Sequence, residues 1–416
     1  MKVLHITPEY PPVIWGGLGT AVGGLTSALA IEKYSVGVLL VGGSLVINKQ
    51  PYGSWKTLSS QELTNQFSAD KYIKKKKIAF FHVSPNEALK SADLLSEYWF
   101  PDLIHLHSAW LLPVAQVIRQ KCNCPIVFTV HSIDKAEYEI GQFFTHWKIQ
   151  EDAINECDRI IAISESEKKL LVSYYPHLVN KIFVIGNGIH DSKNAHRIFD
   201  NRKWNKTDLA VLYTGRFVER KGILELITAI PKVLVDFPNA RFVLAGGYGG
   251  SPEVEKEWLA DILKPFKDHV IFTGWLTPNE VIKWYEKADI LVILSWYEPF
   301  GMVVLEGMLY GLPIVATNIG GPSEILADKK CALLVAPKNV DALAEAILEL
   351  LSNPILRKRL GEAAAKRVRR KWLWNKIVKR IRKAYIHTIL SHRYALNFCL
   401  SQALFCVPLF HFLNDK

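Results

Sequence analysis

The sequence of 416 residues has few cysteines and lacks an export signal. Its six cysteines are scattered without the regular spacing of a disulfide-stapled protein. The opening residues, MKVLHITPEYPP, run from an apolar strand into a proline-rich turn and do not have the pattern of a signal peptide. We therefore expect a protein of the reducing cytoplasm. Cys122 and Cys124 have no second cysteine pair nearby, so we do not expect a metal site there.

Acidic metal-binding pairs and clear membrane spans are also missing. No Asp-X-Asp motif occurs in the chain, so we expect no metal ion held by two such aspartates. The most apolar long stretch, residues 395–413, has the length of a span but is interrupted by polar residues and a proline. We interpret it as a docking tail or an interfacial segment.

Positive charge, by contrast, is in excess. The formal net charge is +11, with a run of lysines at 74–77 and a longer basic stretch at 366–383. Such charge attracts nucleic acid, an anionic membrane face or a phosphorylated substrate. No recognisable nucleic-acid-binding module accompanies it, so nucleic acid is not an expected partner. For residues 366–383, a solvated helix face and a peripheral contact with an anionic membrane are both open.

Short apolar runs alternate with helical patterns along both halves of the chain. The first series begins at residues 3–7 and ends at 181–188, and the second runs from 209–215 to 312–317. Such alternation indicates α/β domains built on parallel sheets. A chain of this length favours two of them.

The polarity of the sequence divides the chain into regions. We expect a first domain at 1–190 and a second domain at 209–372, joined by a polar linker at 189–208. Residues 373–416 would then form a helix that crosses back to the first domain, followed by a basic and apolar tail. The overall prediction is two facing α/β domains with a returning helix.

The residues of chemical interest follow predicted strands. Ligands of parallel sheets sit beyond the carboxyl ends of the strands, and between two domains that edge faces a cleft. We therefore expect loops from both domains to converge on one site. The residues in these loops are Gly16, Gly17, His131, Asn187, Arg216, Lys221 and Glu298.

Two of these loops suit phosphate. Residues 15–24, WGGLGTAVGG, present backbone N–H groups ahead of a helix, although glycines there are equally explained by close packing. Residues 214–223, TGRFVERKGI, place Arg216 and Lys221 where a guanidinium and an ammonium could neutralise a diphosphate. A surface pair of basic residues is the alternative interpretation.

Two glutamates stand in a unit that otherwise looks buried. Predicted strands at 289–295 and 312–317 flank a helix that is apolar nearly all round. Glu298 follows the first strand and Glu306 lies on the helix, although a lone buried carboxylate costs several kcal/mol. Glu298 could serve only as a cap of the helix that begins near Gly301.

Residues 298–306, EPFGMVVLE, resemble the paired-glutamate motif of retaining glycosyltransferases of the glycogen synthase and sucrose synthase type, family 4. Similar segments occur along nearly the whole chain: EYPP-GG-L, PDLIHLHSAW, TVHS, AISESE, GNGI, TGRF-KG and GLPIVAT-IGG-SEI. The resemblance implies the GT-B fold of two facing Rossmann-like domains, with an acceptor-side domain at 1–190 and a nucleotide-sugar-binding domain at 209–372. It also implies transfer of a hexosyl unit from a UDP-, ADP- or GDP-linked sugar, without a cofactor.

The resemblance assigns roles to individual residues. Glu298 would contact hydroxyls of the donor sugar, and Glu306 would bind the ribose. Arg216 and Lys221 would grip the diphosphate, and His131 would lie near the anomeric carbon, unless it is an ordinary core imidazole. No side-chain nucleophile is implied. The implied catalytic set is His131, Arg216, Lys221 and Glu298, and the implied donor-binding set is Gly16, Gly17, Asn187, Arg216, Lys221, Glu298, Phe300, Gly301 and Glu306.

Two departures limit the resemblance. Ile14 stands where starch and bacterial glycogen synthases carry a lysine, and the chain is shorter than most of those enzymes. Both favour a smaller glycan, a lipid or a small molecule as acceptor over a growing polysaccharide. A polysaccharide synthase, a sugar-nucleotide epimerase and a non-catalytic carbohydrate-binding protein are the alternatives. The non-catalytic protein would be expected to lose Arg216, Lys221 or the glutamates.

Overall fold

The computed structural model describes residues 1–11, 16–42, 78–141, 147–191, 209–247, 262–326 and 330–405. The lysines at 74–77, Ile14 and most of the predicted linker at 189–208 lie outside these ranges.

Within the described residues, the first domain is built on a parallel sheet of seven strands in the order β3-β2-β1-β4-β5-β6-β7. Its central strands are buried along their whole length because helices cover both faces. The strands are β1 Lys2–Thr7, β2 Ser35–Val41, β3 Ile78–Val83, β4 Leu103–Leu106, β5 Ile126–Val130, β6 Arg159–Ala162 and β7 Ile182–Val184. The helices are α1 Gly17–Ile31, α4 Ala88–Tyr98, α5 Leu112–Cys122, α6 Asp134–Glu139, α7 Trp147–Glu156 and α8 Glu165–Tyr174.

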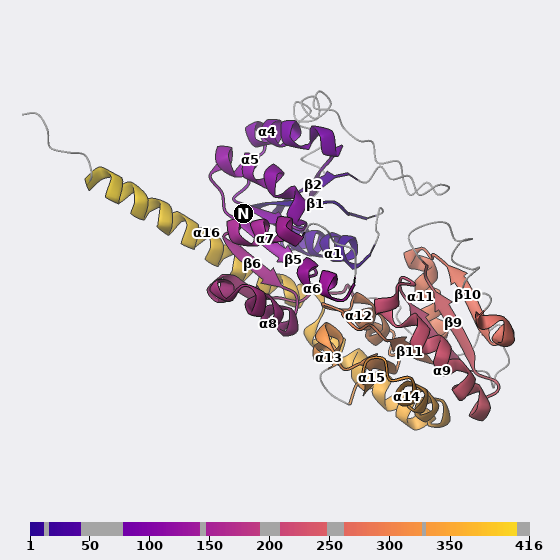
Figure 1. Ribbon diagram of the computed structural model, residues 1–416. Helices are drawn as coiled ribbons and strands as arrows, with labels where there is room; N and C mark the ends of the chain where they lie inside the picture. Colours follow the sequence, from indigo (N-terminus) through magenta and orange to yellow (C-terminus); the bar gives the residue numbers. More distant parts are fainter. Residues whose placement is uncertain are drawn as a thin grey trace, which may run out of the picture.

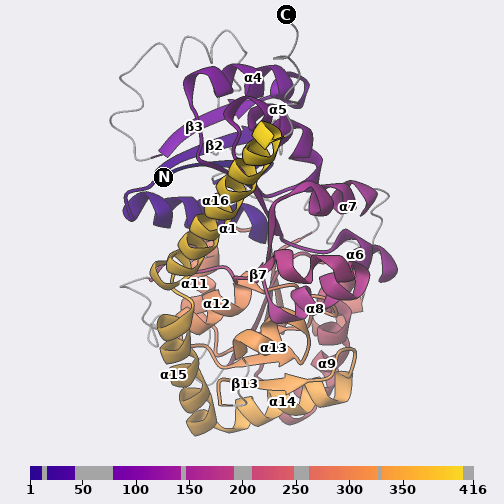
Figure 2. The ribbon, with the colours of Figure 1, turned by 90° about the vertical axis from the view of Figure 1, so that its left-hand side faces the viewer.

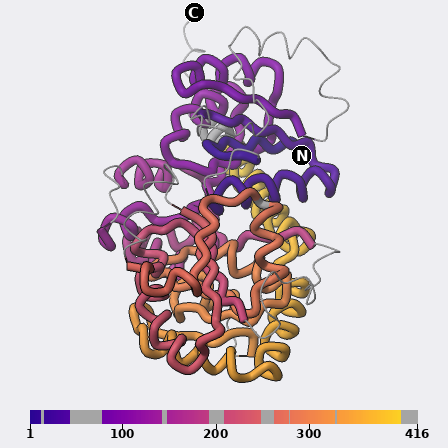
Figure 3. Tube along the Cα trace, turned by 90° about the vertical axis from the view of Figure 1, so that its right-hand side faces the viewer, coloured from indigo at the N-terminus to yellow at the C-terminus, as the bar shows by residue number. Residues whose placement is uncertain are grey.

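The second domain repeats this plan with six described strands in the order β10-β9-β8-β11-β12-β13. The strands are β8 Ala210–Thr214, β9 Arg241–Ala245, β10 Val270–Gly274, β11 Ile290–Ile293, β12 Ile314–Thr317 and β13 Ala332–Val335. The helices are α9 Ile223–Asp236, α11 Pro278–Lys287, α12 Met302–Leu309, α13 Gly320–Leu326, α14 Val340–Ser352 and α15 Pro354–Lys371. Figure 3 shows the two domains as separate bodies, the first drawn from indigo to magenta and the second from rose to orange.

The strand–helix–strand unit predicted from the sequence is confirmed as β11, α12 and β12. Gly301 and Gly311 bound the helix with φ angles of 95° and 66°, a left-handed conformation that glycine adopts without a Cβ clash. Val304, Leu305 and Met308 are fully buried, as the apolar pattern of the helix requires.

A long helix, α16 (Trp374–Phe405), returns from the second domain to the first. Trp374, Ile377 and Tyr385 share a buried cluster with Leu25 and Leu29 of α1. Figure 2 shows α16 running across the first domain, and Figure 1 shows its last turns projecting past that body. The predicted crossover helix is therefore confirmed. Among the helices of the described ranges, not one combines the length and hydropathy that crossing a bilayer requires.

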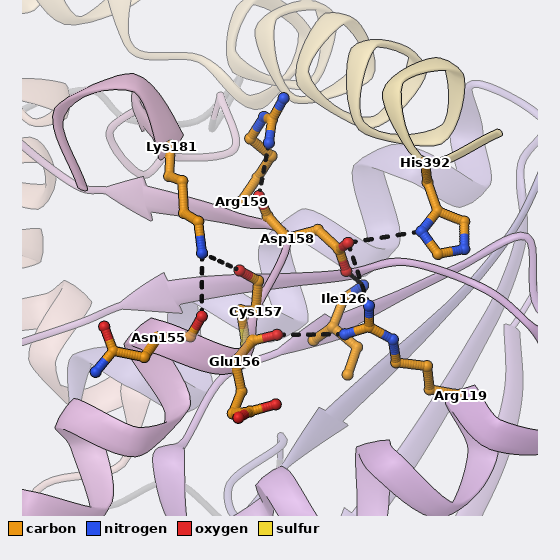
Figure 4. Close-up of polar contacts among 9 residues, drawn as sticks. All are labelled: Arg119, Ile126, Asn155, Glu156, Cys157, Asp158, Arg159, Lys181 and His392. Carbon is orange, nitrogen blue, oxygen red and sulfur yellow. Dashed lines mark hydrogen bonds and ion pairs between the residues drawn. The ribbon is translucent and has the colours of Figure 1, made fainter. Parts of the chain in front are cut away.

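Asp158, just before β6, fixes the far part of α16 to the first domain. Its Oδ1 lies 3.3 Å from a guanidinium nitrogen of Arg119 and 3.5 Å from Nδ1 of His392 on α16. Its Oδ2 accepts a hydrogen bond from the backbone N–H of Ile126 at 2.8 Å. Figure 4 shows these contacts meeting at the carboxylate. The helix is thus held to the sheet well beyond its buried first turns.

Candidate active site

The order of the strands predicts where a ligand binds in each domain. Chain order reverses between β1 and β4 in the first sheet and between β8 and β11 in the second. Loops beyond such a pair of strands diverge and leave room for a ligand. Lys221 and Glu298 follow β8 and β11, and Gly17 and His107 follow β1 and β4, so the candidate residues flank both reversals.

Lys221 and Glu298 meet as an ion pair beyond β8 and β11. Nζ of Lys221 donates to Oε2 of Glu298, and Oγ of Ser295 lies 3.4 Å from the same oxygen. Burial raises the pKa of the Glu298 carboxyl, but the Lys221 ammonium and its hydrogen bond more than offset this, and the pKa lies below its usual value. The carboxylate that looked unpaired in the sequence therefore has a cationic partner.

The interpretation of Glu298 as a helix cap is wrong. Gly301 occupies the position before α12, and within the described residues no side chain bonds to the first turn of that helix. The left-handed Gly301 turns the chain between Glu298 and the helix. The carboxylate consequently faces Lys221 rather than the amides of α12.

The loop that carries Arg216 and Lys221 is held in place by a hydrogen bond from Tyr213 and by close packing at Gly222. The Tyr213 hydroxyl donates to the carbonyl oxygen of Arg216 at 3.0 Å and lies 3.5 Å from that of Lys221. Gly222, with φ 73°, begins α9 so close to β11 that a Cβ there would lie 2.3 Å from the carbonyl oxygen of Leu294. The exposed Arg216 guanidinium, Lys221 and the N-terminus of α9 together form a positive end suited to an anion.

Glu306 has a different environment from Glu298. The Tyr285 hydroxyl of α11 donates to its Oε2 at 2.7 Å and also lies 3.3 Å from the hydroxyl of Thr214. Burial raises the pKa of the Glu306 carboxyl, and the hydrogen bond from Tyr285 offsets this only in part. Glu306 therefore belongs to the same domain as Glu298, but its partner among the described residues is a neutral hydroxyl rather than an ammonium.

On the first-domain side, His131 and Asn187 line one small pocket. The rest of its lining comes from α1, from the first sheet and the loops that follow its strands, and from the start of α16: Ala21, Leu25, His107, Thr129, Ile161, Ile185, Gly186, Trp374, Ile377 and Ile381. Burial lowers the pKa of His131 to about 4, so its imidazole is neutral at pH 7. Its Nε2 lies 3.2 Å from Nδ1 of His107, which follows β4.

Gly17 begins α1 and faces the second domain. A Cβ placed on it would lie 3.5 Å from Cγ of Met302 on α12, whereas a Cβ on Gly16 would meet nothing within 4 Å in the described part of the chain. The backbone N–H of Gly19 donates to a carboxylate oxygen of Glu9 at 3.3 Å. A carboxylate thus already interacts with the helix N-terminus where a phosphate was predicted.

Phe300 packs between the domains. Its buried ring meets that of Trp372 edge-on at 5.5 Å between centroids. A Cβ on Gly186 would lie 2.5 Å from the same ring, so only glycine allows this contact. Because the Phe300 side chain is committed to this packing, a contact with a donor at this position would come from its backbone.

Tyr297 joins the two domains and was not singled out from the sequence. Its hydroxyl accepts from the backbone N–H of Ile133 at 3.0 Å and donates to Oε2 of Glu167 at 3.1 Å. Burial raises the pKa of the Glu167 carboxyl to about 8. Tyr285 and Tyr297 have no distinguishing pattern in the sequence, because it is the fold that brings their hydroxyls to Glu306 and Glu167. Ser295, three residues before Glu298, was not singled out either.

One cluster of histidines lies close enough to share a metal ion. Within the described ranges it consists of His5, His105 and His107. His105, however, uses both ring nitrogens: Nδ1 lies 2.5 Å from the Tyr385 hydroxyl and Nε2 lies 2.6 Å from that of Thr129. The cluster is therefore a hydrogen-bonded group in this structure.

The chain is similar in sequence and in fold to known glycosyltransferases. Residues 15–193 match the family described as Glycosyltransferase Family 4, and residues 194–367 match Glycosyl transferases group 1. An uncharacterized glycosyltransferase of Methanocaldococcus jannaschii is 32% identical over 68% of this chain and 75% of its own. A glycogen synthase of Mycobacterium tuberculosis is 27% identical over 93% and 94%. The structure of Anabaena HepE in complex with UDP and glucose superposes with a TM-score of 0.69 at 18% identity, covering 92% of this chain and 98% of that chain.

Two parallel-sheet domains that face each other across these loops define the GT-B class of proteins. Within that class, the chain belongs to the glycosyltransferases, whose family descriptions match its first and second halves in turn.

Proposed function

We propose that the protein is a retaining glycosyltransferase that moves a hexosyl unit from a nucleoside-diphosphate sugar to an acceptor. One observation carries this proposal: Lys221 and Glu298 are paired beyond the strand reversal of the second sheet, beside Arg216 and the N-terminus of α9. Cations at that place suit a diphosphate, and a carboxylate suits sugar hydroxyls.

The reaction follows from these positions. The bond between the anomeric carbon and the diphosphate oxygen breaks, and Arg216 and Lys221 stabilise the charge that develops on the leaving diphosphate. The acceptor oxygen bonds to the same face of the anomeric carbon, and its proton passes to the departing phosphate. This route needs no enzymic base, which agrees with His131 being neutral and its pKa low.

The donor is tested first with UDP-sugars, because HepE, which shares the fold, was solved with UDP and glucose. A thermal-shift panel of UDP-, ADP- and GDP-sugars identifies the donor, and proton NMR of the product reports the anomeric configuration. Transfer with retention supports the proposal. Inversion, or conversion of the donor without an acceptor, would contradict it.

A smaller glycan, a lipid or a small molecule is the acceptor we propose, since Ile14 departs from the starch and glycogen synthase pattern. The similarity to a glycogen synthase supports a polysaccharide acceptor as the second candidate. Measuring product length separates them: one added unit favours the small acceptor, and processive extension of glycogen favours the polysaccharide. Tight donor binding with no turnover on any acceptor would indicate a carbohydrate-binding protein instead.

We also propose a peripheral contact between α16 and an anionic membrane. Leu390 and Tyr394 are 60% and 75% exposed, and with Ile386 they repeat every four residues along one side of the helix. The opposite side is held to the sheet by His392 and Asp158 (Figure 4). This exposed row, which we call the α16 ridge, therefore faces away from the protein.

The charge of this region supports an anionic partner. Residues 363–414 contain eleven lysines and arginines and no acidic residue. The formal charge of this segment, +11, equals the net charge of the entire chain. Lys379, Arg382 and Lys383 are exposed on α16 just ahead of the ridge. Basic residues beside a short apolar row favour a surface of anionic lipid, with each cation contributing about 1 kcal/mol.

Liposome sedimentation tests this contact. Binding should rise with the fraction of phosphatidylglycerol, fall with salt and be lost in the double variant Leu390→Asp, Tyr394→Asp. Val235→Asp is the matched control, because Val235 is an 81% exposed apolar residue on α9 of the other domain. Equal recovery in the supernatant with neutral and anionic vesicles would show that the ridge is a solvated helix face.

A further inference from the structure

Three imidazoles form a continuous hydrogen-bonded chain that leads from the pocket into the first sheet. His131 Nε2 lies 3.2 Å from His107 Nδ1, and His107 Nε2 lies 3.0 Å from His5 Nδ1. The chain ends at Nε2 of His5, which is buried and has no hydrogen-bond partner among the described residues. We call these residues the histidine chain.

The three rings of the histidine chain are uncharged at neutral pH. Burial lowers the pKa of His5 to about 3 and that of His131 to about 4, and it lowers the pKa of His107 well below its usual value. At pH 7 each ring is therefore neutral and has one N–H donor and one bare nitrogen. Since each of the two hydrogen bonds uses one proton, only two arrangements satisfy both bonds.

The two arrangements differ at the ends of the chain. If the protons point inward, His131 donates from Nε2, and His5 is left with a buried Nε2–H that has no acceptor. If they point outward, His5 donates from Nδ1, His107 donates to Nε2 of His131, and the nitrogen left unpaired on His5 is a bare acceptor. Buried backbone donors without a partner are rarer than under-satisfied acceptors, and the same preference favours the outward order here.

We propose that His107 and His5 are positioning residues that hold His131 as its Nδ1–H tautomer, so that His131 presents an N–H donor to the pocket it shares with Asn187. The use of this donor rests on the proposed function: a neutral N–H suits an oxygen of the donor sugar and adds no charge. His131 would then bind and orient the substrate and would not act as a base.

His105 provides an internal control. It lies two residues from His107, is equally buried, and bonds to Tyr385 and Thr129 rather than to the histidine chain. A change at His105 therefore disturbs the same packed face of the sheet without breaking a link of the chain.

The tautomer can be measured without substrate. Long-range proton–nitrogen NMR of the full-length protein labelled with nitrogen-15 histidine distinguishes the two tautomers at pH 7, and the spectrum of His131→Asn assigns the His131 signals. We expect Nδ1–H in the wild type and in His105→Gln. An Nε2–H signal for wild-type His131 would overturn the proposal, even if every variant failed to fold.

Substitutions at His107 test its control over the tautomer. His107→Leu should convert His131 to a mixture of tautomers, whereas His107→Asn, whose amide keeps an N–H donor near Nδ1, should preserve Nδ1–H. An unchanged His131 spectrum in His107→Leu, or an equal change in His105→Gln, would show that the histidine chain does not set the tautomer. Stoichiometric zinc that is lost in His5→Leu would show a metal site instead.

Steady-state kinetics then test the functional part. His107→Leu should lower kcat about 10-fold while leaving the affinity for the sugarless nucleotide unchanged, and His107→Asn should recover most of the loss. Unchanged kcat in a His107→Leu variant with the altered tautomer would contradict the role of the N–H donor. If the wild type transfers no sugar, the proposed function fails while the NMR result stands by itself.

Discussion

The two domains present chemically different faces to each other. On the second-domain face, Arg216 and Lys221 are cations, and Lys221 lowers the pKa of Glu298 so that its carboxylate is ionised. On the first-domain face, burial lowers the pKa of His131 to about 4 and raises that of Glu167 to about 8, so both groups are neutral at pH 7.

The difference comes from the partners that the fold supplies. Glu298 meets an ammonium, whereas the partner of the Glu167 carboxyl among the described residues is the hydroxyl of Tyr297. A nucleoside-diphosphate sugar shows the same division, since its diphosphate is charged and its sugar is not. We infer that the cations of the charged face receive the diphosphate, and that the sugar lies between Glu298 and the neutral face. The predictions below test this division, from the largest expected effect to the smallest.

Removing the cations should have the largest effect. Arg216→Ala and Lys221→Ala should each lower kcat by about 10²-fold or more, because the lost charge stabilises the leaving diphosphate mainly in the transition state. Lys232→Ala is the matched control, since Lys232 on α9 forms an exposed ion pair with Asp341 of α14. Wild-type turnover in the double variant Arg216→Ala, Lys221→Ala would end the assignment of the charged face.

The two glutamates should respond differently to the same substitution. Glu298→Gln keeps the shape but weakens the bonds that orient the sugar, so kcat should fall by about 10-fold with little change in affinity for the nucleoside diphosphate. Glu306→Gln should weaken binding of that nucleotide by about 1–2 kcal/mol, as expected for loss of a charge-assisted bond to the ribose. Calorimetry beside steady-state rates measures both quantities.

The pattern of these two results decides the roles. A loss of nucleotide affinity in Glu298→Gln with none in Glu306→Gln would reverse the assignment. If neither variant changes either quantity, both carboxylates are structural.

The sequence predicted the fold better than the environments of the site residues. Strand periodicity and the glycines at 301 and 311 placed β11, α12 and β12, because these signals are local. The pairing of Lys221 with Glu298 requires β8 and β11 to be neighbours, which follows only once the order of the sheet is known.

The tyrosines could not be found in this way. Tyr297 reaches Glu167 across 130 residues of chain, and Tyr285 reaches Glu306 across 21, through contacts between separate elements that no local pattern signals. His105 and His107, two residues apart in PDLIHLHSAW, did carry a signal, since that spacing puts both side chains on one face of a strand.

The neutral state of Glu167 on the first-domain face should make the stability of the protein depend on pH. The pKa of Glu167 lies at about 8 in the folded protein and at 4.5 without perturbation, and burial is the main cause. The folded state therefore binds this proton more tightly than the unfolded state. Its stabilising contribution is fully present below 4.5 and is lost as the pH rises through about 8.

Glu167→Gln removes this titration while keeping the hydrogen-bonding shape. From acidic to alkaline pH, the Tm of the wild type should fall by about 2 °C or more relative to the variant. Glu165→Gln, at an exposed neighbour on α8, should follow the wild type. Parallel curves for all three proteins would mean that Glu167 is ionised, and that the first-domain face is not neutral.

Removal of metal ions should have the smallest effect of all. If Arg216, Lys221 and the N-terminus of α9 provide the positive charge of the second-domain face, a divalent cation has no charge left to neutralise on the diphosphate. The chain also lacks an Asp-X-Asp pair to hold one. Dialysis against excess EDTA should therefore leave most of the transferase activity, and added Mg²⁺ or Mn²⁺ should not raise it. Complete loss of activity that either cation restores would show that the second-domain face needs a metal ion to neutralise the diphosphate. The positive charge of that face would then come in part from the ion and not from the side chains alone.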